Sequence, residues 1–361
     1  ANQGVAVDVQ NPRSFRRINI NGQMSVWQRG TSITTQGYTP DRYYQKFSDA
    51  GSITHTISQQ SLTSSDTPWD SGFRYFQRHA LSAAGTANTD AELYTQHTIE
   101  AQDLAASGWN YTSTSSYLTV SFWVRVSTSQ KFYLNLRTRD GTHQAYNIPF
   151  TPSANTWTKV TAQVPGNSNI QIDNNNDKGL HLNFYKFLGT DETGGSSENA
   201  WAAYSGTAKV PDMASTWLTA GASTFDLTGL QLEVGDVVTD FEHRSYGEEL
   251  ARCQRYYQQS YTPGISPGTN TTGNAIVWYP DNAVNYASIS FGLPVTMRTQ
   301  PSITIYSSTG ASGKIRNTDT NTDLASYVNS NNTTLLQFVV NNTAVPQSNT
   351  LRCHYTASAE L

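Results

Sequence analysis

The sequence is poor in cysteine and in charged residues. Two cysteines, Cys253 and Cys353, are too few for a disulfide framework. They favour two separate buried thiols and assembly in a reducing cytoplasm. Charged residues make up 14% of the chain, against about 25% in an average soluble domain. Ser, Thr, Asn, Gln and Gly take their place, as is typical of β-structures with many exposed turns.

Long runs of one residue type are also missing. No apolar stretch reaches the length of about 18 residues that a membrane span needs, so we expect no membrane insertion. The opening ANQGVAVDVQ lacks the apolar segment of a signal peptide. The net charge is -4 and no long basic run occurs, so nucleic-acid binding is not expected. The His residues are scattered without metal-ligand spacing, and we expect neither a metal nor another cofactor.

The clearest signal that is present is an alternation of apolar and polar residues. In YLTVSFWVRV, Tyr117–Val126, every second residue is apolar, which predicts a half-buried strand. The same pattern predicts strands at 131–139, 157–164, 180–187 and 225–234, between turn-forming clusters such as PGNSN and DNNNDKG. No repeat of fixed period is visible, which argues against a propeller or a solenoid. The pattern therefore predicts an antiparallel β-sandwich, and we favour a jelly roll.

One stretch, FEHRSYGEELARCQRYYQQSY at residues 241–261, departs from this alternation. Ser245 and Glu248 match a capping box at the start of a helix. Helical spacing puts one apolar stripe on this helix, made of Tyr246, Leu250, Cys253 and Tyr257. The opposite face is expected to carry Glu248, Glu249, Arg252 and Arg255. The spacing predicts a helix over 246–258 that joins two β units.

Strand patterns resume after this helix, at 275–279, 286–293, 302–306, 335–340 and 350–357. We therefore predict an all-β protein with four parts. An N-terminal attachment arm covers 1–17, and a jelly-roll domain covers 18–245. The linking helix follows at 246–258, and a second, smaller β-sandwich domain occupies 262–361.

Several segments resemble bacteriophage tail, fibre and other virion appendage proteins. In those proteins a segment like TDFEHRSYGEELARCQRYY closes a carbohydrate-binding-module-like jelly roll, and one like INGQMSVWQRGTSITTQGYTPDRYY opens it. LTVSFWVRV and LTGLQLEVGDVVTDFE resemble inner strands of the same domain, and LPVTMRTQPSITIY resembles the segment that often follows the helix. One departure is Tyr43, where the family often has Trp after the Asp-Arg pair. The resemblance covers most of residues 18–306.

The resemblance implies a virion structural protein that is assembled in the host cytoplasm. Such parts self-assemble, and we expect a homotrimer. The N-terminal arm is expected to dock on another virion protein. Tail fibre, tail spike, head fibre and capsid decoration all stay open as the place of the protein in the particle.

The outer face of the predicted sheet holds the candidate binding residues. Flat aromatic rings beside planar polar groups suit sugars, and arginine also pairs with the carboxylate of a sugar acid. The candidates for glycan binding or subunit contact are Trp123, Arg125, Tyr133, Arg137, Arg139, His181 and Tyr185. Lys159, Asn135 and Asn183 share this face by phase. Aromatic residues in or near loops, such as Trp201 and Tyr204, are either ligand anchors or caps of the sandwich. Contact with a neighbouring subunit and a merely solvated face are the competing interpretations.

No pattern marks a catalytic or metal site. Glycan hydrolysis needs two carboxylates across a cleft, but the acidic candidates lie on different predicted elements: Asp70, Glu100, Asp103, Asp226 and Glu233. Asp173, Asn175 and Asp177 have the spacing of a calcium loop, yet Lys178 stands before the glycine. An Asn-rich turn is the favoured interpretation of that segment.

The leading hypothesis is therefore a non-enzymatic virion protein, a tail or head fibre or spike, that contacts a host-surface polysaccharide. A ligand-free capsid or tail decoration protein and a glycan depolymerase are the alternatives.

Overall fold

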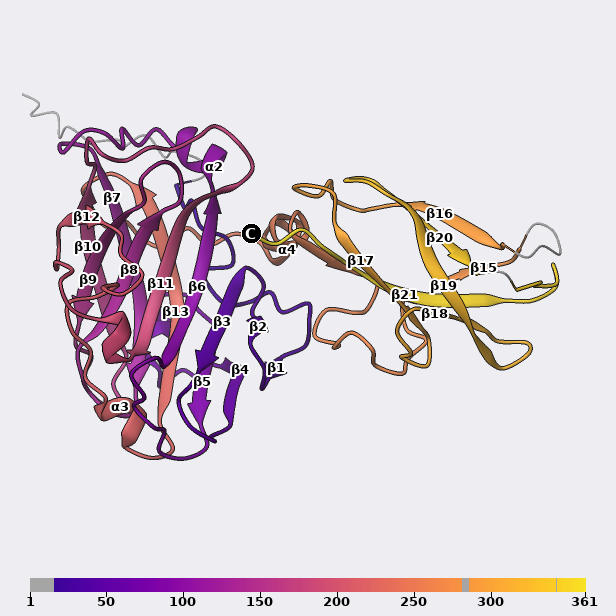
Figure 1. Ribbon diagram of the computed structural model, residues 1–361, viewed down its shortest axis with the longest axis horizontal. Helices are drawn as coiled ribbons and strands as arrows, with labels where there is room; N and C mark the ends of the chain where they lie inside the picture. Colours follow the sequence, from indigo (N-terminus) through magenta and orange to yellow (C-terminus); the bar gives the residue numbers. More distant parts are fainter. Residues whose placement is uncertain (1–15, 281–285, 342) are drawn as a thin grey trace, which may run out of the picture.

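The chain forms two lobes that meet at a narrow joint (Figure 1). The computed structural model describes residues 16–280, 286–341 and 343–361. The expected attachment arm therefore lies outside the described residues, apart from Arg16 and Arg17. Within the described ranges, no helix has the length and apolar character needed to cross a lipid bilayer.

One sheet of the larger lobe has six strands in the order β1-β4-β5-β13-β7-β10, all paired antiparallel. Their bounds are Ser32–Ile33 (β1), His55–Ser61 (β4), Tyr75–Leu81 (β5), Tyr117–Val126 (β7), Thr158–Pro165 (β10) and Thr224–Val234 (β13). Strands distant in sequence, such as β5 and β13, are neighbours because the chain passes repeatedly between the two sheets.

The other sheet has seven strands in the order β12-β9-β8-β11-β6-β3-β2. Their bounds are Gly37–Tyr38 (β2), Tyr43–Ser48 (β3), Glu92–Glu100 (β6), Phe132–Thr138 (β8), Gln144–Phe150 (β9), Lys178–Leu188 (β11) and Trp201–Ala203 (β12). Strand β11 contains a bulge between Tyr185 and Phe187. The predicted strands at 131–139, 157–164, 180–187 and 225–234 correspond to β8, β10, β11 and β13.

The core of the larger lobe lies between the two sheets. Phe122 of β7 packs edge-on against Phe184 of β11 and Phe150 of β9, with ring centroids 5.0 and 5.2 Å apart. The alternation that predicted inward-facing residues is confirmed along β7 and β11, where those side chains are buried. Tyr43 is also buried, in the position where the resembling family has Trp. The predicted all-β jelly-roll sandwich is confirmed.

Short helical turns lie in the connections of the larger lobe. They are α1 (Thr67–Asp70), α2 (Ala101–Ala105), η1 (Thr190–Glu192) and α3 (Thr216–Thr219). Leu104 of α2 and Trp217 of α3 insert into the sandwich core, so these turns close its ends.

The smaller lobe is built on β21, which pairs with β14, β15, β17 and β18. The bounds are Tyr257–Gln259 (β14), Ile276–Trp278 (β15), Ser288–Gly292 (β16), Ser302–Ser307 (β17), Lys314–Asn317 (β18), Thr322–Asn331 (β19), Leu335–Val340 (β20) and Leu351–Ser358 (β21). It has a core of its own, in which Phe338 of β20 packs near Tyr355 of β21 and Phe291 of β16.

Helix α4, Tyr246–Gln254, connects the lobes. Its predicted cap is confirmed, because the Ser245 hydroxyl accepts a hydrogen bond from the Glu248 backbone N–H at 3.3 Å. The helix is shorter than predicted, since Tyr257 already belongs to β14 and pairs with β21. The predicted outward position of Glu249 is wrong: its side chain is 0% exposed and forms an ion pair with Arg17. Pairing of β14 with β21 ends the helix early, and the ion pair with Arg17 turns Glu249 inward.

The joint is held by charged and backbone contacts that cross between the lobes. Arg29 pairs with Glu360 at 2.7 Å, and Arg42 pairs with the same carboxylate. The Ala359 N–H donates to the Tyr256 carbonyl at 2.7 Å, which fixes the segment after β21 against the end of α4. The two thiols stay apart, as predicted: Cys253 and Cys353 are both buried and unbonded.

Candidate functional site

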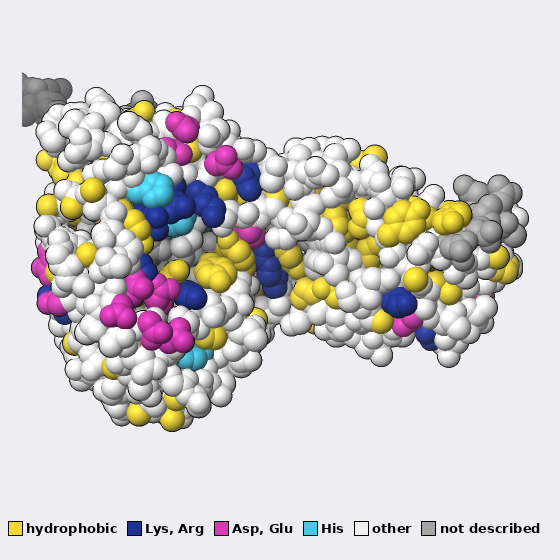
Figure 2. Space-filling view, viewed as in Figure 1, with side chains coloured by type: hydrophobic (Ala, Val, Ile, Leu, Met, Phe, Trp, Pro, Cys, Tyr) yellow, Lys and Arg dark blue, Asp and Glu magenta, His cyan; other side chains and the backbone are white. Residues whose placement is uncertain are grey.

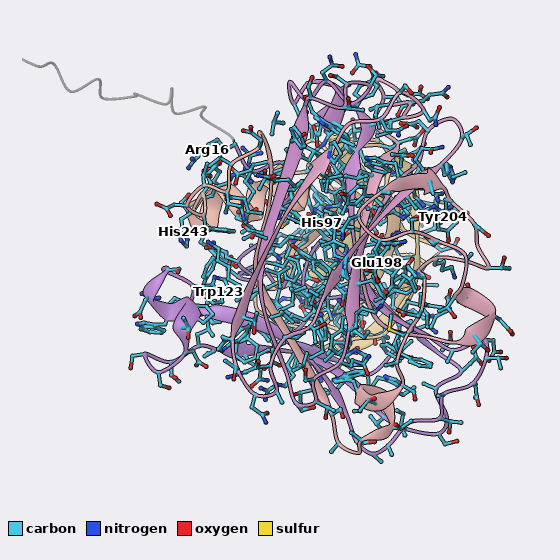
Figure 3. The ribbon with its side chains drawn as sticks, turned by 90° about the vertical axis from the view of Figure 1, so that its left-hand side faces the viewer. Arg16, His97, Trp123, Glu198, Tyr204 and His243 are labelled. Atoms are coloured by element: carbon cyan, nitrogen blue, oxygen red, sulfur yellow. The ribbon has the colours of Figure 1, made fainter. Side chains whose placement is uncertain are left out.

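The candidate residues do not share one face, contrary to expectation. Strand β7 belongs to the six-stranded sheet, whereas β8 and β11 belong to the seven-stranded sheet. Trp123 and Arg125 therefore lie on the opposite side of the sandwich from Tyr133, Arg137 and His181. In Figure 3, Trp123 and His243 lie on one side of the lobe and Glu198 and Tyr204 on the other. Alternation assigns a residue to a face of its sheet but does not assign the strand to a sheet.

Arg125 is occupied by contacts within the chain. Its guanidinium bonds Asp226 and Asp66, each at 2.9 Å, and lies 4.6 Å from the Trp157 ring centroid. Asp226 is fully buried and also binds Arg78 through two hydrogen bonds of 2.8 and 2.9 Å. These contacts hold α1 and strands β5, β7 and β13 together, which is a structural role.

Trp123 lines a pocket of about 360 Å³ on the outer face of the six-stranded sheet. Lys159, Phe241 and His243 line it as well. The pocket wall is shaped by Gly229, whose φ of +65° and close neighbours exclude a side chain: a Cβ there would lie 2.8 Å from the Phe73 ring. Trp123 is thus separated from the other candidates but keeps a cavity beside it.

Tyr133 and Tyr185 are on the seven-stranded sheet but are buried by the chain itself. The Tyr133 hydroxyl oxygen lies 2.7 Å from Glu198 and 2.5 Å from Asp212, and its single proton is shared between the two carboxylates. Tyr185 packs with Tyr133 in a small cluster that includes Val210. Both rings therefore support the covering segment 196–213, and the expected direct contact of these rings with a ligand or a subunit is not available.

Beside these rings, amide side chains form a ladder across neighbouring strands. The residues opposite one another are Asn147 of β9, Asn135 of β8, Asn183 of β11 and Gln96 of β6. Asn135 Nδ2 donates to Asn147 Oδ1 at 2.8 Å, and Asn183 Nδ2 donates to Asn135 Oδ1 at 3.2 Å. This ladder stiffens the face and fixes the strand ends that follow it.

The next rows of the same face carry a cluster of basic side chains. Its members are Arg137 and Arg139, which follow Asn135 along the chain, with His181, His143 and Lys178. His181 stands opposite Arg137 in the β8–β11 register. Figure 2 shows Lys, Arg and His side chains gathered on this face, next to a group of Asp and Glu side chains. We call these five residues the basic cluster.

Tyr204 contributes the aromatic ring that the sequence pattern did not place on this face. The Arg137 guanidinium carbon lies 3.5 Å from the Tyr204 ring centroid. The Tyr204 N–H donates to the His143 carbonyl at 2.8 Å, which ties the loop after β12 to the turn before β9. Tyr204 and His143 reach the cluster through loops, so strand phase gave no signal for either.

Burial and repulsion from neighbouring positive charges lower the pKa values of His181, His143, Arg139 and Lys178. The pKa of His181 is well below its usual value, first because of burial and then because of Arg139 and Arg137. Burial and the same two arginines lower the pKa of His143. The pKa of Arg139 falls through burial and the adjacent Arg137 charge, and that of Lys178 through burial and Arg139. The cluster thus holds more positive charge than its surroundings balance.

Some polar atoms of the cluster have no partner. Within the described residues, neither Arg137 nor Arg139 has a carboxylate within ion-pair distance. The Nε atoms of both, and Nε2 of His181, are buried without a hydrogen-bond partner in the described part of the chain. Buried polar groups are seldom left unpaired, and exceptions often mark a place for a ligand or water.

The acidic candidates are not brought together. Asp226 binds Arg78 and Arg125, and Glu100 binds Arg255 with both carboxylate oxygens at 2.9 Å. Asp70 lines the Trp123 pocket on the opposite sheet. Asp103 is exposed on α2 and Glu233 bonds Thr239, so these five carboxylates form no pair across a cleft.

A pair of carboxylates that was not predicted does meet at the covering segment. Glu198 and Asp212 both bind Lys131, at 2.9 and 2.8 Å, as well as Tyr133. Hydrogen bonds from Lys131 and Tyr133 lower the pKa of both acids. Both are therefore ionised at neutral pH, which suits a structural ion pair and not the proton donor that glycoside hydrolysis uses.

No metal site is apparent in the described ranges. There, no three side chains among His, Cys, Asp and Glu come together as possible ligands. The segment that resembles a calcium loop is a turn, in which Asn175 Oδ1 accepts from the Asp177 N–H at 2.9 Å. The Asp173 N–H donates to Asp140 at 3.0 Å.

Comparisons with known proteins give structural similarity only. No family model matches the chain, and no curated protein has a similar sequence. A sugar-binding protein, described as putative, from Bacteroides thetaiotaomicron is 8% identical, with a TM-score of 0.31 over 61% of this chain and 100% of its own. A family 4 carbohydrate-binding module is 12% identical, with a TM-score of 0.30 over 60% of this chain and 99% of its own. The tripod from the baseplate of bacteriophage Tuc2009 is 11% identical, with a TM-score of 0.25 over 60% and 73%. Similarities of this size leave function to be argued from the site.

Proposed function

We propose that the chain is a bacteriophage virion appendage protein that binds a host-surface glycan without cleaving it. The binding surface is the outer face of the seven-stranded sheet, around Arg137 and Tyr204. The single observation that carries this proposal is the basic cluster with its unpaired donors beside the Tyr204 ring.

The chemistry of this face fits a saccharide. Sugars offer hydroxyl groups in many directions and apolar ring faces, so their sites combine aromatic surfaces with planar hydrogen-bonding groups. Tyr204 and Arg137 provide a ring and a fork of N–H donors. Tyr94 and Tyr44, on β6 and β3 of the same sheet, are partly exposed and extend the surface. The covering segment 196–213 reaches across part of this face, where Glu198 binds Tyr133 of β8 and Lys209 pairs with Glu92 of β6.

The virion part of the proposal rests on the segments that resemble phage appendage proteins. In the structure the opening and closing segments meet, although they are about 200 residues apart. The Asn21 N–H donates to Glu249 at 2.5 Å, and the Gln28 amide donates to the Tyr257 carbonyl at 2.9 Å. Their shared role in one buried joint supports treating them as one motif. Self-assembly as a trimer and docking through the N-terminal arm remain part of the proposal.

The test is binding of the purified protein to polysaccharides extracted from the host surface, measured by surface plasmon resonance. We expect Tyr204→Ala to weaken binding at least tenfold. Arg74→Ala is the matched control, because Arg74 is an exposed arginine on an aromatic ring, 3.8 Å from Trp69, on the other side of the lobe. Its affinity is expected to equal that of the wild type.

Three results would contradict the proposal. Loss of binding in Trp123→Ala with normal binding in Tyr204→Ala would place the site in the pocket on the six-stranded sheet. Absence of binding to every host polysaccharide would favour the ligand-free decoration protein. Release of reducing ends from a bound polysaccharide would favour the depolymerase.

A further inference from the structure

We infer that the glycan is acidic, and that the face seats a carboxylate, sulfate or phosphate group of the saccharide between Arg137, Arg139 and His181. This inference rests on the proposed function and narrows the class of saccharide that the same site accepts. A neutral glycan would bring no negative charge to balance the basic cluster.

The charges around the cluster point to an anion. Arg137 and Arg139 are only partly exposed, and His181 is buried. Few acids offset these charges: Asp140 lies next to Arg139 and accepts a hydrogen bond from the Asp173 N–H at 3.0 Å, and Asp177 lies 3.7 Å from Arg298. Like charges that are partly removed from water repel one another, so their assembly is costly unless a bound anion offsets it.

The unpaired nitrogens suit an oxyanion: two are arginine donors, and the third, on His181, is a donor whenever it carries a proton. The Nε–H groups of Arg137 and Arg139 have no acceptor in the described part of the chain, and neither has Nε2 of His181. A carboxylate, sulfate or phosphate presents several oxygen acceptors close together, and arginine binds such groups through paired N–H donors. A hydroxyl group offers a single oxygen and carries no charge, so it satisfies fewer of these donors.

The arginine that faces the ligand is held in place before binding. Arg137 stacks on Tyr204 and its Nη2 donates to His143 Nδ1 at 3.0 Å. Because a guanidinium nitrogen only donates, His143 Nδ1 must accept, so His143 is neutral with its proton on Nε2. A fixed guanidinium loses little conformational freedom when it binds, which favours affinity.

Binding of an anion is also expected to depend on pH. Burial lowers the pKa of both imidazoles, Arg139 and Arg137 lower both further, and Lys178 adds to the effect on His181. Asp140 lies on the same side, next to Arg139. A bound anion would raise both imidazole pKa values, so binding takes up protons and affinity rises as the pH falls from 8 to 5.5. A sulfate or a sugar carboxylate stays ionised over this range.

The experiment uses matched pairs of charged and uncharged saccharides on the full chain, measured by isothermal titration calorimetry. The pairs are oligogalacturonate with its methyl ester, a dextran sulfate oligosaccharide with the unsulfated dextran oligosaccharide, and phosphorylated with unphosphorylated oligomannose. We expect at least one charged member to bind ten times or more tightly than its uncharged partner, which also identifies the anionic group. We expect this preference to shrink in 1 M salt, where the Debye screening length falls to about 3 Å.

Arg139→Gln tests the site itself. It is expected to remove most of the preference for the charged member while keeping binding of the uncharged one. Because it relieves repulsion with Arg137, the unliganded variant should unfold at the same temperature as the wild type or higher. That combination separates a ligand-binding role from a structural one, which would lower the unfolding temperature.

The outcomes also separate this inference from the proposed function. Equal affinity for the charged and uncharged members of every pair would overturn the acidic preference and keep the glycan-binding proposal. Binding of no member of any pair would overturn the acidic preference alone, and would overturn both only together with absence of binding to every host polysaccharide.

Discussion

At the scale of single residues, Lys186 shows how one polar side chain enters the core. The bulge in β11 after Tyr185 turns Lys186 inward. There its Nζ donates to Thr95 Oγ1 at 2.7 Å, and burial lowers its pKa to about 7. The folded chain therefore tolerates this amine partly by keeping it neutral.

Lys186→Met is expected to stabilise the protein. Met has a similar length and no charge to desolvate, and replacing buried charges by apolar residues of similar volume often gains about 1–4 kcal/mol. Thr95 stays satisfied, because it donates to Gln45 at 2.8 Å and accepts from Gln77 at 3.1 Å. Urea unfolding at pH 7 measures the change. A lower free energy of unfolding would show that the Lys186–Thr95 bond matters more than the buried amine.

The candidate residues also show what sequence can tell about a site. The phase of β8 and β11 correctly put Arg137, Arg139 and His181 on one face, because side chains alternate strictly between strand bulges. Tyr133 was predicted to be accessible and is not, because its cover comes from a loop some 65 residues further on. Tyr204 stacks on Arg137 through the same loop region. Loop paths depend on tertiary packing, so no local pattern in the sequence reveals such contacts.

At the scale of elements, α4 is fixed by its buried acid more than by its cap. Glu249 accepts from the Asn21 N–H at 2.5 Å, pairs with Arg17 and lies 3.8 Å from Arg244. These contacts connect the helix to the opening segment of the larger lobe. The sequence predicted the helix from its cap and spacing but placed Glu249 outside, because the partner Arg17 is more than 200 residues away.

Glu249→Gln is expected to lower the free energy of unfolding by about 3–5 kcal/mol. The variant keeps the shape of the side chain but leaves Arg17 as a buried charge without its partner. Chemical denaturation measures the loss. Glu248→Gln is the control, because Glu248 is exposed and pairs with Arg252 across one helical turn, a contact worth less than about 0.5 kcal/mol. Equal losses in both variants would contradict the assigned role of Glu249.

Ser245→Ala tests the cap of the same helix. Loss of the hydrogen bond to the Glu248 N–H leaves one backbone donor at the helix start without its partner. A cap of this kind contributes about 1 kcal/mol, so we expect a loss of that size in the free energy of unfolding. Ser245→Asp, which restores an acceptor, should recover most of it. A loss that Asp does not recover would mean that Ser245 acts otherwise than as a cap.

The strands divide into those that sequence could place and those that it could not. Strand β7 was predicted with its observed bounds because its alternation is regular and all its inward-facing residues are apolar. Strands β4 to β6 carry more polar side chains, including inward-facing Gln77, His79 and Thr95, so their alternation is weak. These polar side chains are buried because they bond to polar partners inside the sandwich, and such contacts cannot be predicted from composition.

At the scale of the whole molecule, buried imidazoles set the dependence of stability on pH. Burial lowers the pKa of His55 to about 4, and burial places those of His79, His97 and His181 well below 6.5. Below pH 6.5 the unfolded chain binds protons at these sites and the folded chain does not. The free energy of unfolding must therefore fall as the pH decreases through this range.

We expect the unfolding temperature to drop clearly between pH 7 and pH 5. Each buried imidazole lowers the free energy of unfolding by up to about 1.4 kcal/mol for each pH unit of acidification. Asp41, whose pKa burial raises to about 6, acts in the opposite direction, as do Asp103 and Asp140, whose pKa values burial also raises, but the four imidazoles outnumber these acids. Thermal unfolding followed by circular dichroism across this range checks the sign. A constant or rising unfolding temperature on acidification would contradict the buried, neutral imidazoles.

The joint also determines how firmly the two lobes are held relative to each other. The chain passes between the lobes twice, outward after α4 and back along β21. After the second pass, Glu360 forms ion pairs with Arg29 and Arg42 of the larger lobe. Two chain connections resist rotation of one lobe against the other, whereas a single connection would allow it. The basic cluster faces sideways from the long axis of the molecule (Figures 1 and 2). The joint thus holds the face at a fixed angle to the smaller lobe, so under the proposed function a polysaccharide would be bound along the flank of the molecule and not at its tip.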